Sequence, residues 1–197
     1  MIVMITIITS TMAAMYPTTL KNHQAVLLAL NHYGLGIQAM IEKRSPEALV
    51  HFHAAIQEYD HFAPAYYNLG VLYGQMDKLN EALDCIEQAV VVANTEQHWQ
   101  TFTSANNYLG HLYRSKDTYD YTKLSKALQH FDAALSISPS DILLVDYVAA
   151  MYNKALTLST LGYQDQALQL LQKVLQLNPK HTGAYLQLSH LYYQKQD

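Results

Sequence analysis

Ten histidines and one cysteine are the side chains in this 197-residue chain that most invite a chemical interpretation. His51 and His53 form the closest histidine pair, but residues two apart on a helix point about 200° apart and cannot share one metal ion. Cys85 adjoins the core position Ile86 and lacks the positioned base that a catalytic cysteine needs. We therefore interpret the two histidines as surface positions and the cysteine as partly buried filler, and we predict no metal site, no catalytic residue and no cofactor.

Motifs for nucleotide binding and hydrolysis are also missing from the sequence. Gly34-Leu35-Gly36 begins like a dinucleotide fingerprint, but no third glycine follows at the required place and no strand is expected before it. The sequence has no phosphate-binding loop, no Gly-x-Ser-x-Gly elbow and no His-Glu-x-x-His motif. We predict that the protein is not an enzyme.

Composition narrows the class of protein further. Half of the residues are hydrophobic and only 14% are charged, against about 25% in a typical soluble domain, so the chain can bury a core and is not intrinsically disordered over most of its length. A net charge of -4 and a pI near 6.2 argue against a nucleic-acid binder. A single cysteine excludes an internal disulfide or a multi-cysteine metal site. The unusual number is 16 tyrosines, against 4 phenylalanines and 1 tryptophan.

Two short motifs recur from about residue 21 onward and predict a chain of helix–turn–helix units. One is Ala-Leu followed by apolar or small residues three and six places after the leucine, and it begins at Ala48, Ala82, Ala127 and Ala167. The other is Leu-Gly, beginning at Leu35, Leu69 and Leu109. Both motifs place apolar residues three and four apart, which is the helical period. Their small residues indicate where paired helices approach closely.

This pattern resembles the tetratricopeptide repeat family, whose period of 34 residues is the distance from Ala48 to Ala82. The matching residues are Tyr66, Leu69, Gly70 and Tyr73 for the first helix and Ala127, Phe131, Ala134 and Pro139 for the second. The resemblance covers roughly residues 29–197. It implies an all-α fold, a right-handed superhelical solenoid of antiparallel helix pairs, with about four repeats and a terminal helix. It also implies that four tyrosines pack in the core: Tyr66, Tyr73, Tyr113 and Tyr192.

We predict a leader at 1–20 and a repeat array at 21–197, with repeats at about 29–62, 63–96, 97–141 and 142–181 and a terminal helix at 182–196. The spacing from Ala82 to Ala127 is 45 residues and that from Ala127 to Ala167 is 40, so we expect longer first helices and a longer turn at 115–125. That turn carries Tyr119 and Tyr121, which we interpret as ordinary loop variation with a docking loop as the alternative.

The first twenty residues carry no charged side chain, and three interpretations of them stay open. A membrane anchor needs about 20 predominantly apolar residues, which several threonines and Pro17 dilute here. A secretory signal needs a basic start, and no Lys or Arg precedes Lys21. A poorly ordered leader is the interpretation that we favour, and it predicts a cytoplasmic protein. If residues 1–20 act as a signal, the protein is secreted, periplasmic or membrane-anchored instead.

In the family, the first helices line a concave groove that holds the ligand. The groove residues that the resemblance implies here are Tyr33, Ile37, Tyr67, Asn68, Val71, Asn107, Tyr108, His111, Arg114, Tyr152 and Asn153. Tyrosine offers a rigid apolar face with one hydroxyl, and asparagine both donates and accepts hydrogen bonds. We therefore predict a protein–protein adaptor or scaffold that binds an extended neutral or mildly apolar peptide.

Two other interpretations of function stay open, and one mode of the family is excluded. The chain could be a regulatory or targeting domain of a larger enzyme or assembly complex, or it could form a homodimer through its terminal helix. The family's carboxylate clamp for acidic chaperone tails needs Lys and Asn on one repeat, Asn on the next, and Lys and Arg on the third. Of the five matching places only Asn68 agrees, and both cationic ends are missing, so we predict no binding of such tails.

Overall fold

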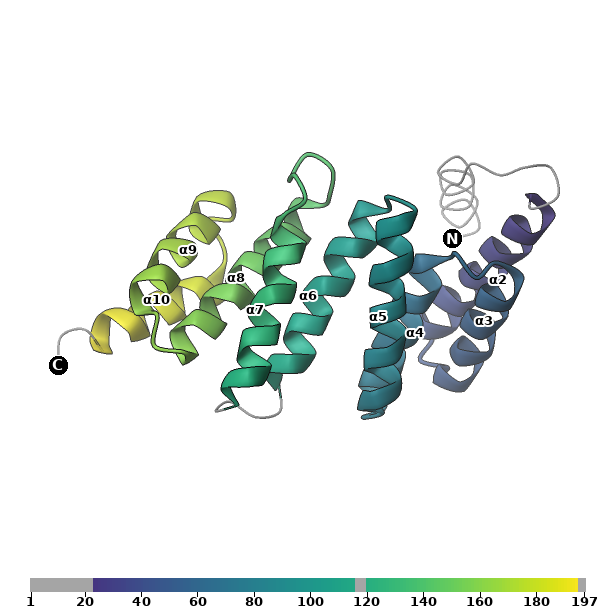
Figure 1. Ribbon diagram of the computed structural model, residues 1–197, viewed down its shortest axis with the longest axis horizontal. Helices are drawn as coiled ribbons and strands as arrows, with labels where there is room; N and C mark the ends of the chain where they lie inside the picture. The colour runs from purple at the N-terminus through teal and green to yellow at the C-terminus, as the bar shows by residue number, and fades with distance from the viewer. Residues whose placement is uncertain (1–22, 116–119, 195–197) are drawn as a thin grey trace. The chain divides into compact units, whose positions relative to one another are not determined.

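The computed structural model describes residues 23–115 and 120–194, and this part of the chain is all α-helical (Figure 1). Its nine helices are α2 His23–Ile41, α3 Ser45–Glu58, α4 Ala63–Gln75, α5 Leu79–Thr95, α6 Trp99–Ser115, α7 Tyr121–Leu135, α8 Leu144–Thr160, α9 Gln164–Leu177 and α10 Thr182–Gln194. The helices follow one another as antiparallel pairs with α10 last, which confirms the predicted fold class. The predicted leader and Tyr119 lie outside the described residues.

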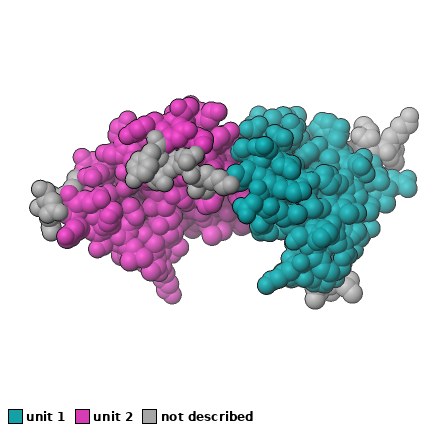
Figure 2. All heavy atoms as spheres, turned by 90° about the horizontal axis from the view of Figure 1, so that it is seen from below, with its two compact units in different colours: residues 1–101 teal, residues 102–197 magenta. Residues whose placement is uncertain are grey.

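The chain divides into two compact units, residues 1–101 and 102–197 (Figure 2). Unit 1 contains α2 to α5, and unit 2 contains most of α6 together with α7 to α10. In neither unit is a described helix both long and apolar enough to cross a lipid bilayer.

Glycines in the first helix of three of the four pairs let the second helix approach closely. A Cβ atom at Gly36 would lie 2.6 Å from Phe52 Cε1, and one at Gly70 would lie 2.5 Å from Ile86 Cγ1. In unit 2, a Cβ at Gly110 would lie 2.5 Å from the ring of Phe131. Real Cβ atoms do not come this close to other side chains, so any larger residue would push the helices apart. The close approach predicted at these three glycines is confirmed.

The core of unit 1 lies between its paired helices. Phe52 on α3 and Leu69 on α4 are essentially inaccessible and belong to one cluster with Ala39 on α2. Val26 and Leu30 on α2 pack with the buried Phe62, which directly precedes α4, in a second cluster. Burying a leucine or phenylalanine side chain stabilises a fold by about 1.5–3 kcal/mol, so these clusters hold α2, α3 and α4 together.

One core cluster of unit 2 joins α8, α9 and α10. Its members larger than alanine are Val148, Met151 and Leu158 on α8, Leu168, Leu171 and Val174 on α9, and Leu188 and Leu191 on α10. At the place where the second and third repeats bury Leu69 and Leu109, α8 carries Lys154, whose ammonium group forms an ion pair with Asp132 on α7. The degenerate fourth repeat therefore replaces a buried apolar contact with a charged one near the surface.

The extra residues of the third and fourth repeats lengthen their first helices, as predicted. Helices α6 and α8 each have 17 residues, against 13 in α4, although α2 of the first repeat has 19. The second helix α5 is also longer than α3, with 17 residues against 14. One packing prediction is wrong: Tyr192 on α10 is 48% exposed, whereas Tyr66, Tyr73 and Tyr113 are half-buried.

Candidate functional site

In unit 1, one asparagine links two successive first helices. The side-chain Nδ2 of Asn68 on α4 donates to the hydroxyl of Tyr33 on α2 at 3.0 Å. The same nitrogen donates to the carbonyl oxygen of Pro64, one turn earlier on α4, also at 3.0 Å. An asparagine amide has two N–H groups, so both are used within the protein. This pair fixes the direction in which Tyr33 and Asn68 point.

Tyr33 is held more firmly than the groove prediction assumed. Its ring packs edge-on against Phe62, with ring centroids 5.1 Å apart, and at a tilt against Phe52, at 5.9 Å. Burial raises the pKa of Tyr33 to about 12, although the hydrogen bond from Asn68 partly offsets the rise. The hydroxyl therefore stays protonated at any physiological pH, and Tyr33 acts mainly as an anchor for Asn68.

The other predicted residues of unit 1 accompany this pair on α2 and α4. Ile37 lies one turn after Tyr33 and packs against the core cluster, and Tyr67 and Val71 lie one turn apart on α4. All three side chains are half-buried. We call the five residues Tyr33, Ile37, Tyr67, Asn68 and Val71 the unit 1 face.

In unit 2, an equivalent asparagine repeats the link. Nδ2 of Asn153 on α8 donates to Oδ1 of Asn107 on α6 at 3.1 Å. Asn153 directly precedes Lys154-Ala155, the counterpart of Leu69-Gly70, so it occupies the same place in its repeat as Asn68. Its partner Asn107 likewise matches Tyr33, two residues before the Leu-Gly leucine. The asparagines of the predicted groove thus link one first helix to the next inside each unit.

The remaining predicted residues of unit 2 form an aromatic and cationic group. The rings of Tyr108 and His111 on α6 are stacked, with centroids 6.4 Å apart. Partial burial lowers the pKa of His111 and the charge of Arg114 lowers it further, so the imidazole is neutral at neutral pH. Burial also lowers the pKa of Arg114, whose Nε is buried without a hydrogen-bond partner among the described residues. With Tyr152, Asn107 and Asn153 these residues make up what we call the unit 2 face.

Sequence reasoning missed two neighbours of the unit 2 face. Ser104 Oγ on α6 donates to Asp146 Oδ2 on α8 at 3.2 Å. The ring of Tyr152 lies against His181, which directly precedes α10, with centroids 4.5 Å apart. Helical spacing could have identified Ser104, since it lies one turn before Asn107. The position of His181 depends on the path of the loop from α9 to α10, which the spacing does not give.

The candidate chemical residues are engaged in pairs between helices. Nδ1 of His51 lies 3.4 Å from Nδ1 of His32 across α2 and α3, and His53 Nε2 lies 3.1 Å from the Tyr73 hydroxyl. Within the described ranges, no group of three or more His, Cys, Asp or Glu side chains is placed to hold a metal ion. Cys85 is half-buried, and burial raises the pKa of its thiol to about 11, with Asp84 and Glu81 adding to the rise.

Family models agree with this geometry. Two models described as tetratricopeptide repeat match residues 63–93, on α4 and α5, and residues 148–181, on α8 and α9. The chain therefore contains tetratricopeptide repeats. Solved structures support the same fold for this repeat protein. It resembles MamA 41-end from Desulfovibrio magneticus RS-1, with a TM-score of 0.66, 15% identity and 86% of each chain covered.

Another structure with the same repeats is TTC0263, a thermophilic TPR protein in Thermus thermophilus. Its TM-score is 0.57 and its identity 23%, over 85% of the present chain and 82% of the other. BtubC from P. vanneervenii matches with a TM-score of 0.66 and 16% identity, over 79% of the present chain and 65% of its own. At these identities the likeness concerns the fold alone.

Two sequence relatives match only a part of the repeat protein. It is 36% identical over 67 residues to the probable UDP-N-acetylglucosamine–peptide N-acetylglucosaminyltransferase SPINDLY of Oryza sativa subsp. japonica. It is 34% identical over 64 residues to the protein of the same name from Hordeum vulgare. The matches take in 34% and 32% of the present chain but only 7% of each relative, so the chain spans a small fraction of their length.

Proposed function

We propose that this repeat protein is a non-enzymatic adaptor that binds an extended, uncharged or mildly apolar peptide segment on the first-helix faces of its units. Tetratricopeptide repeats mediate protein–protein interactions, and the two repeat matches indicate a protein partner. That the ligand is an extended peptide, and that it binds on these two faces, goes beyond this general role. They rest on the side chains that the faces present and on the hydrogen bonds that hold them.

The observation that carries the proposal is the repeated asparagine link. Asn68 and Asn153 occupy the same place in two different repeats, and each bonds to the preceding first helix of its own unit. These bonds order the side chains before a ligand arrives, which lowers the conformational entropy lost on binding. Tyrosine rings beside them add rigid apolar contact area. A preordered surface of this kind suits peptide recognition.

The hydrogen bonds also define what the faces can offer to a peptide. Both N–H groups of Asn68 are used by Tyr33 and Pro64, whereas its Oδ1 has no hydrogen-bond partner among the described residues. That oxygen can accept a peptide N–H. In unit 2, Asn107 accepts from Asn153 through Oδ1, which leaves its own Nδ2 to donate to a peptide carbonyl. One face thus supplies an acceptor and the other a donor for main-chain groups.

The charge on the faces supports a neutral ligand. Arg114 is the one formally charged residue among the eleven face residues, and His111 is neutral at neutral pH. An acidic tail would find no second cation, so it would leave carboxylates desolvated and unpaired. We therefore expect binding of neutral segments and no binding of acidic chaperone tails.

A displayed library of random 12-residue peptides tests the proposal. The full chain, Val71→Asp and Val91→Asp are each used to select peptides, because Val71 lies on the unit 1 face and Val91 is exposed on the second helix α5. We expect the wild type and Val91→Asp to enrich the same uncharged peptides. Val71→Asp should enrich few of them, because a carboxylate beside a bound apolar segment is costly to desolvate.

Far-UV circular dichroism of the three proteins provides the folding control. Equal helix content in Val71→Asp and Val91→Asp assigns any difference in selection to the face itself. If the wild type enriches no peptide, or if Val71→Asp enriches the same set, the faces do not bind peptides and the proposal is wrong. Submicromolar affinity for an acidic C-terminal tail peptide would contradict the expected neutrality of the ligand.

A second candidate function is that of a repeat segment within a larger enzyme or assembly complex. The observation that favours it is the partial match to the two SPINDLY proteins, in which a chain of similar sequence makes up 7% of a much longer protein. An antibody against residues 121–135 would separate the two candidates on a blot of native cell extract. A band near the mass of the present chain, 22.3 kDa, supports the adaptor. A much larger band supports the segment of an enzyme.

A further inference from the structure

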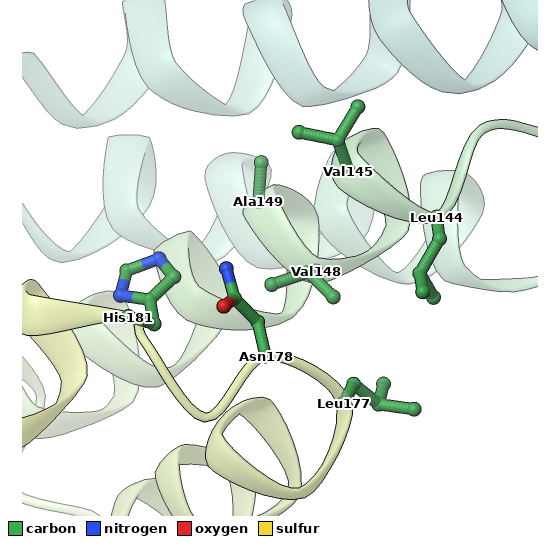
Figure 3. Close-up of a pocket in the computed structure, with 7 residues that line it drawn as sticks. All are labelled: Leu144, Val145, Val148, Ala149, Leu177, Asn178 and His181. Carbon is green, nitrogen blue, oxygen red and sulfur yellow. The ribbon is translucent and has the colours of Figure 1, made fainter.

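An apolar pocket of about 400 Å³ lies in unit 2 between the start of α8 and the loop that joins α9 to α10 (Figure 3). Its lining residues are Leu144, Val145, Val148, Ala149, Leu177, Asn178 and His181. Figure 3 shows Leu144 and Leu177 at one end, the His181 ring and the Asn178 amide at the other, and Val148 between them. The pocket therefore has an apolar end and a polar end.

The pocket exists because α8 begins early. Leu144 and Val145 belong to the first turn of this 17-residue helix, and they remain 47% and 69% exposed. Leu177, at the end of α9, is 42% exposed, whereas Val148 is buried in the core of unit 2 and forms the floor. Exposed apolar side chains around a buried floor form a concave surface, and covering it with another apolar group would remove that surface from water, which is favourable.

The pocket is continuous with the unit 2 face. Val145, Ala149 and Tyr152 follow one another at spacings of four and three residues, so they lie on one side of α8. At the polar end, the ring of His181 lies 4.5 Å from that of Tyr152, centroid to centroid. Gly183 makes room for this contact, since a Cβ there would lie 2.7 Å from the Tyr152 hydroxyl. A peptide that reaches Tyr152 and Asn153 can therefore extend into the pocket.

At the polar end, two side-chain nitrogens can donate a hydrogen bond to a ligand. His181 Nδ1 accepts the backbone N–H of Ala184 at 3.1 Å, which leaves Nε2 as the N–H donor of the neutral ring. Asn178 Oδ1 accepts the backbone N–H of Lys180 at 3.2 Å, so its Nδ2 can donate. Two donors at one end of an apolar pocket suit the carbonyl group of a peptide whose side chain fills the other end.

We infer that this pocket receives one large uncharged apolar side chain, such as leucine, isoleucine, methionine or phenylalanine, from the peptide bound on the unit 2 face. The inference rests on the proposed function and adds an anchor residue to it. None of the seven lining residues carries a formal charge when His181 is neutral, so a charged side chain would be desolvated there without a partner. A volume of about 400 Å³ accommodates a side chain together with its own main-chain atoms.

The test uses a synthetic, fluorescently labelled copy of the peptide most enriched by the wild-type protein, and fluorescence anisotropy gives its affinity. We expect this peptide to contain a large apolar residue. Replacing that residue with alanine should weaken binding to the wild type about 10- to 100-fold, the effect of burying one such side chain. The same replacement in the peptide should hardly change its affinity for Val145→Asp, because the altered pocket no longer stabilises the apolar side chain.

Val50→Asp is the matched control, since Val50 is also an exposed helical valine, 66% exposed on α3 in unit 1. It should bind the peptide as the wild type does. Leu177→Gln is a second pocket variant, on a different helix, and it should lower the affinity for the peptide in the same way as Val145→Asp. Both substituted side chains are exposed, so neither variant should lose helix content.

The outcomes separate this inference from the proposed function. If peptides are enriched but Val145→Asp and Leu177→Gln bind them as the wild type does, the pocket inference alone is wrong. If the two variants instead abolish a concentration-dependent dimer in sedimentation and leave peptide affinity unchanged, the pocket joins two copies of the chain, which also overturns it. If no peptide is enriched at all, the proposed function and the pocket inference fail together.

Discussion

The side chain of Asn153 on α8 donates to Oδ1 of Asn107 on α6, and the distance of 3.1 Å makes this a direct hydrogen bond between two first helices of unit 2. Both side chains are half-buried, so removing one partner leaves the other poorly solvated. The bond therefore contributes to stability as well as to the order of the unit 2 face. Asn68 and Tyr33 form the corresponding bond in unit 1.

A double-mutant cycle on Asn107 and Asn153 should reveal this bond as a coupling energy. We expect Asn107→Ala and Asn153→Ala each to destabilise the protein, and the double variant to cost less than their sum by about 0.5–1.5 kcal/mol. Urea unfolding followed by circular dichroism measures the four free energies. Asn94→Ala, which removes an exposed asparagine from α5, should change stability little. Strictly additive effects would mean that the bond does not form in solution.

The close contact between Gly110 and Phe131 predicts that even a methyl group destabilises the third repeat. In Gly110→Ala the new Cβ would lie 2.5 Å from the phenylalanine ring, and the ring must move. Overpacking of this kind costs about 1–3 kcal/mol, which exceeds the gain of up to about 1 kcal/mol from replacing glycine with alanine inside a helix. Thermal unfolding should therefore show a lower melting temperature.

A compensating substitution tests the cause of that loss. Phe131→Leu removes the ring atoms that a methyl group at position 110 would meet, so Gly110→Ala should cost less in the Phe131→Leu background than in the wild type. An equal cost in both backgrounds would show that the glycine matters for another reason.

Cys85 should react slowly with thiol reagents in the folded protein. Burial is the main cause that raises the pKa of its thiol from 9.0 to about 11, so at pH 7 the thiolate is about 100-fold scarcer than in the unfolded chain. The rate of alkylation by iodoacetamide, followed by mass spectrometry, should drop by at least that factor on folding. The same chain in 8 M urea serves as the control. Comparable rates in the two states would show that the thiol is accessible and normally acidic.

The parts of the fold that follow from local spacing could be predicted from the sequence. Gly36 with Phe52 and Gly110 with Phe131 were predictable, because each glycine and its partner stand at fixed places in a repeated motif. The greater length of α8 than of α4 followed from the 40-residue spacing in the same way. Helical periodicity and repeat length carry this information, since both depend only on residues near in the chain.

The contacts that depend on how helices are rotated against each other could not be predicted in this way. The pairing of His32 with His51 was missed because reasoning within one helix compared His51 only with His53. Tyr192 matches a packing position of the repeat, yet it is exposed, because α10 packs on α8 and α9 and no described helix covers its other side. For the same reason, only the structure could identify the hydrogen-bond partners of Asn68 and Asn153. The positions of these two asparagines in their repeats follow from the sequence alone.

His98 should make the stability of the protein depend on pH below neutrality. Its side chain is 7% exposed in unit 1, and its Nδ1 accepts the backbone N–H of Thr101 at 3.3 Å, in the manner of a helix N-cap for α6. Burial lowers the pKa of His98 below its ordinary value of 6.5. Protonation would turn the accepting nitrogen into a donor that faces another donor, so the folded state resists it.

The sign of the effect follows from the direction of this shift. Near and below pH 6.5 the unfolded chain binds a proton at residue 98 more readily than the folded protein does, so the free energy of unfolding falls as the pH falls through 6.5 towards the lowered pKa. Urea midpoints between pH 8 and pH 5 measure this slope. His98→Asn keeps an acceptor for the Thr101 N–H but cannot titrate, so its stability should decline less with acid than that of the wild type. An unchanged slope in His98→Asn would contradict the assignment to His98.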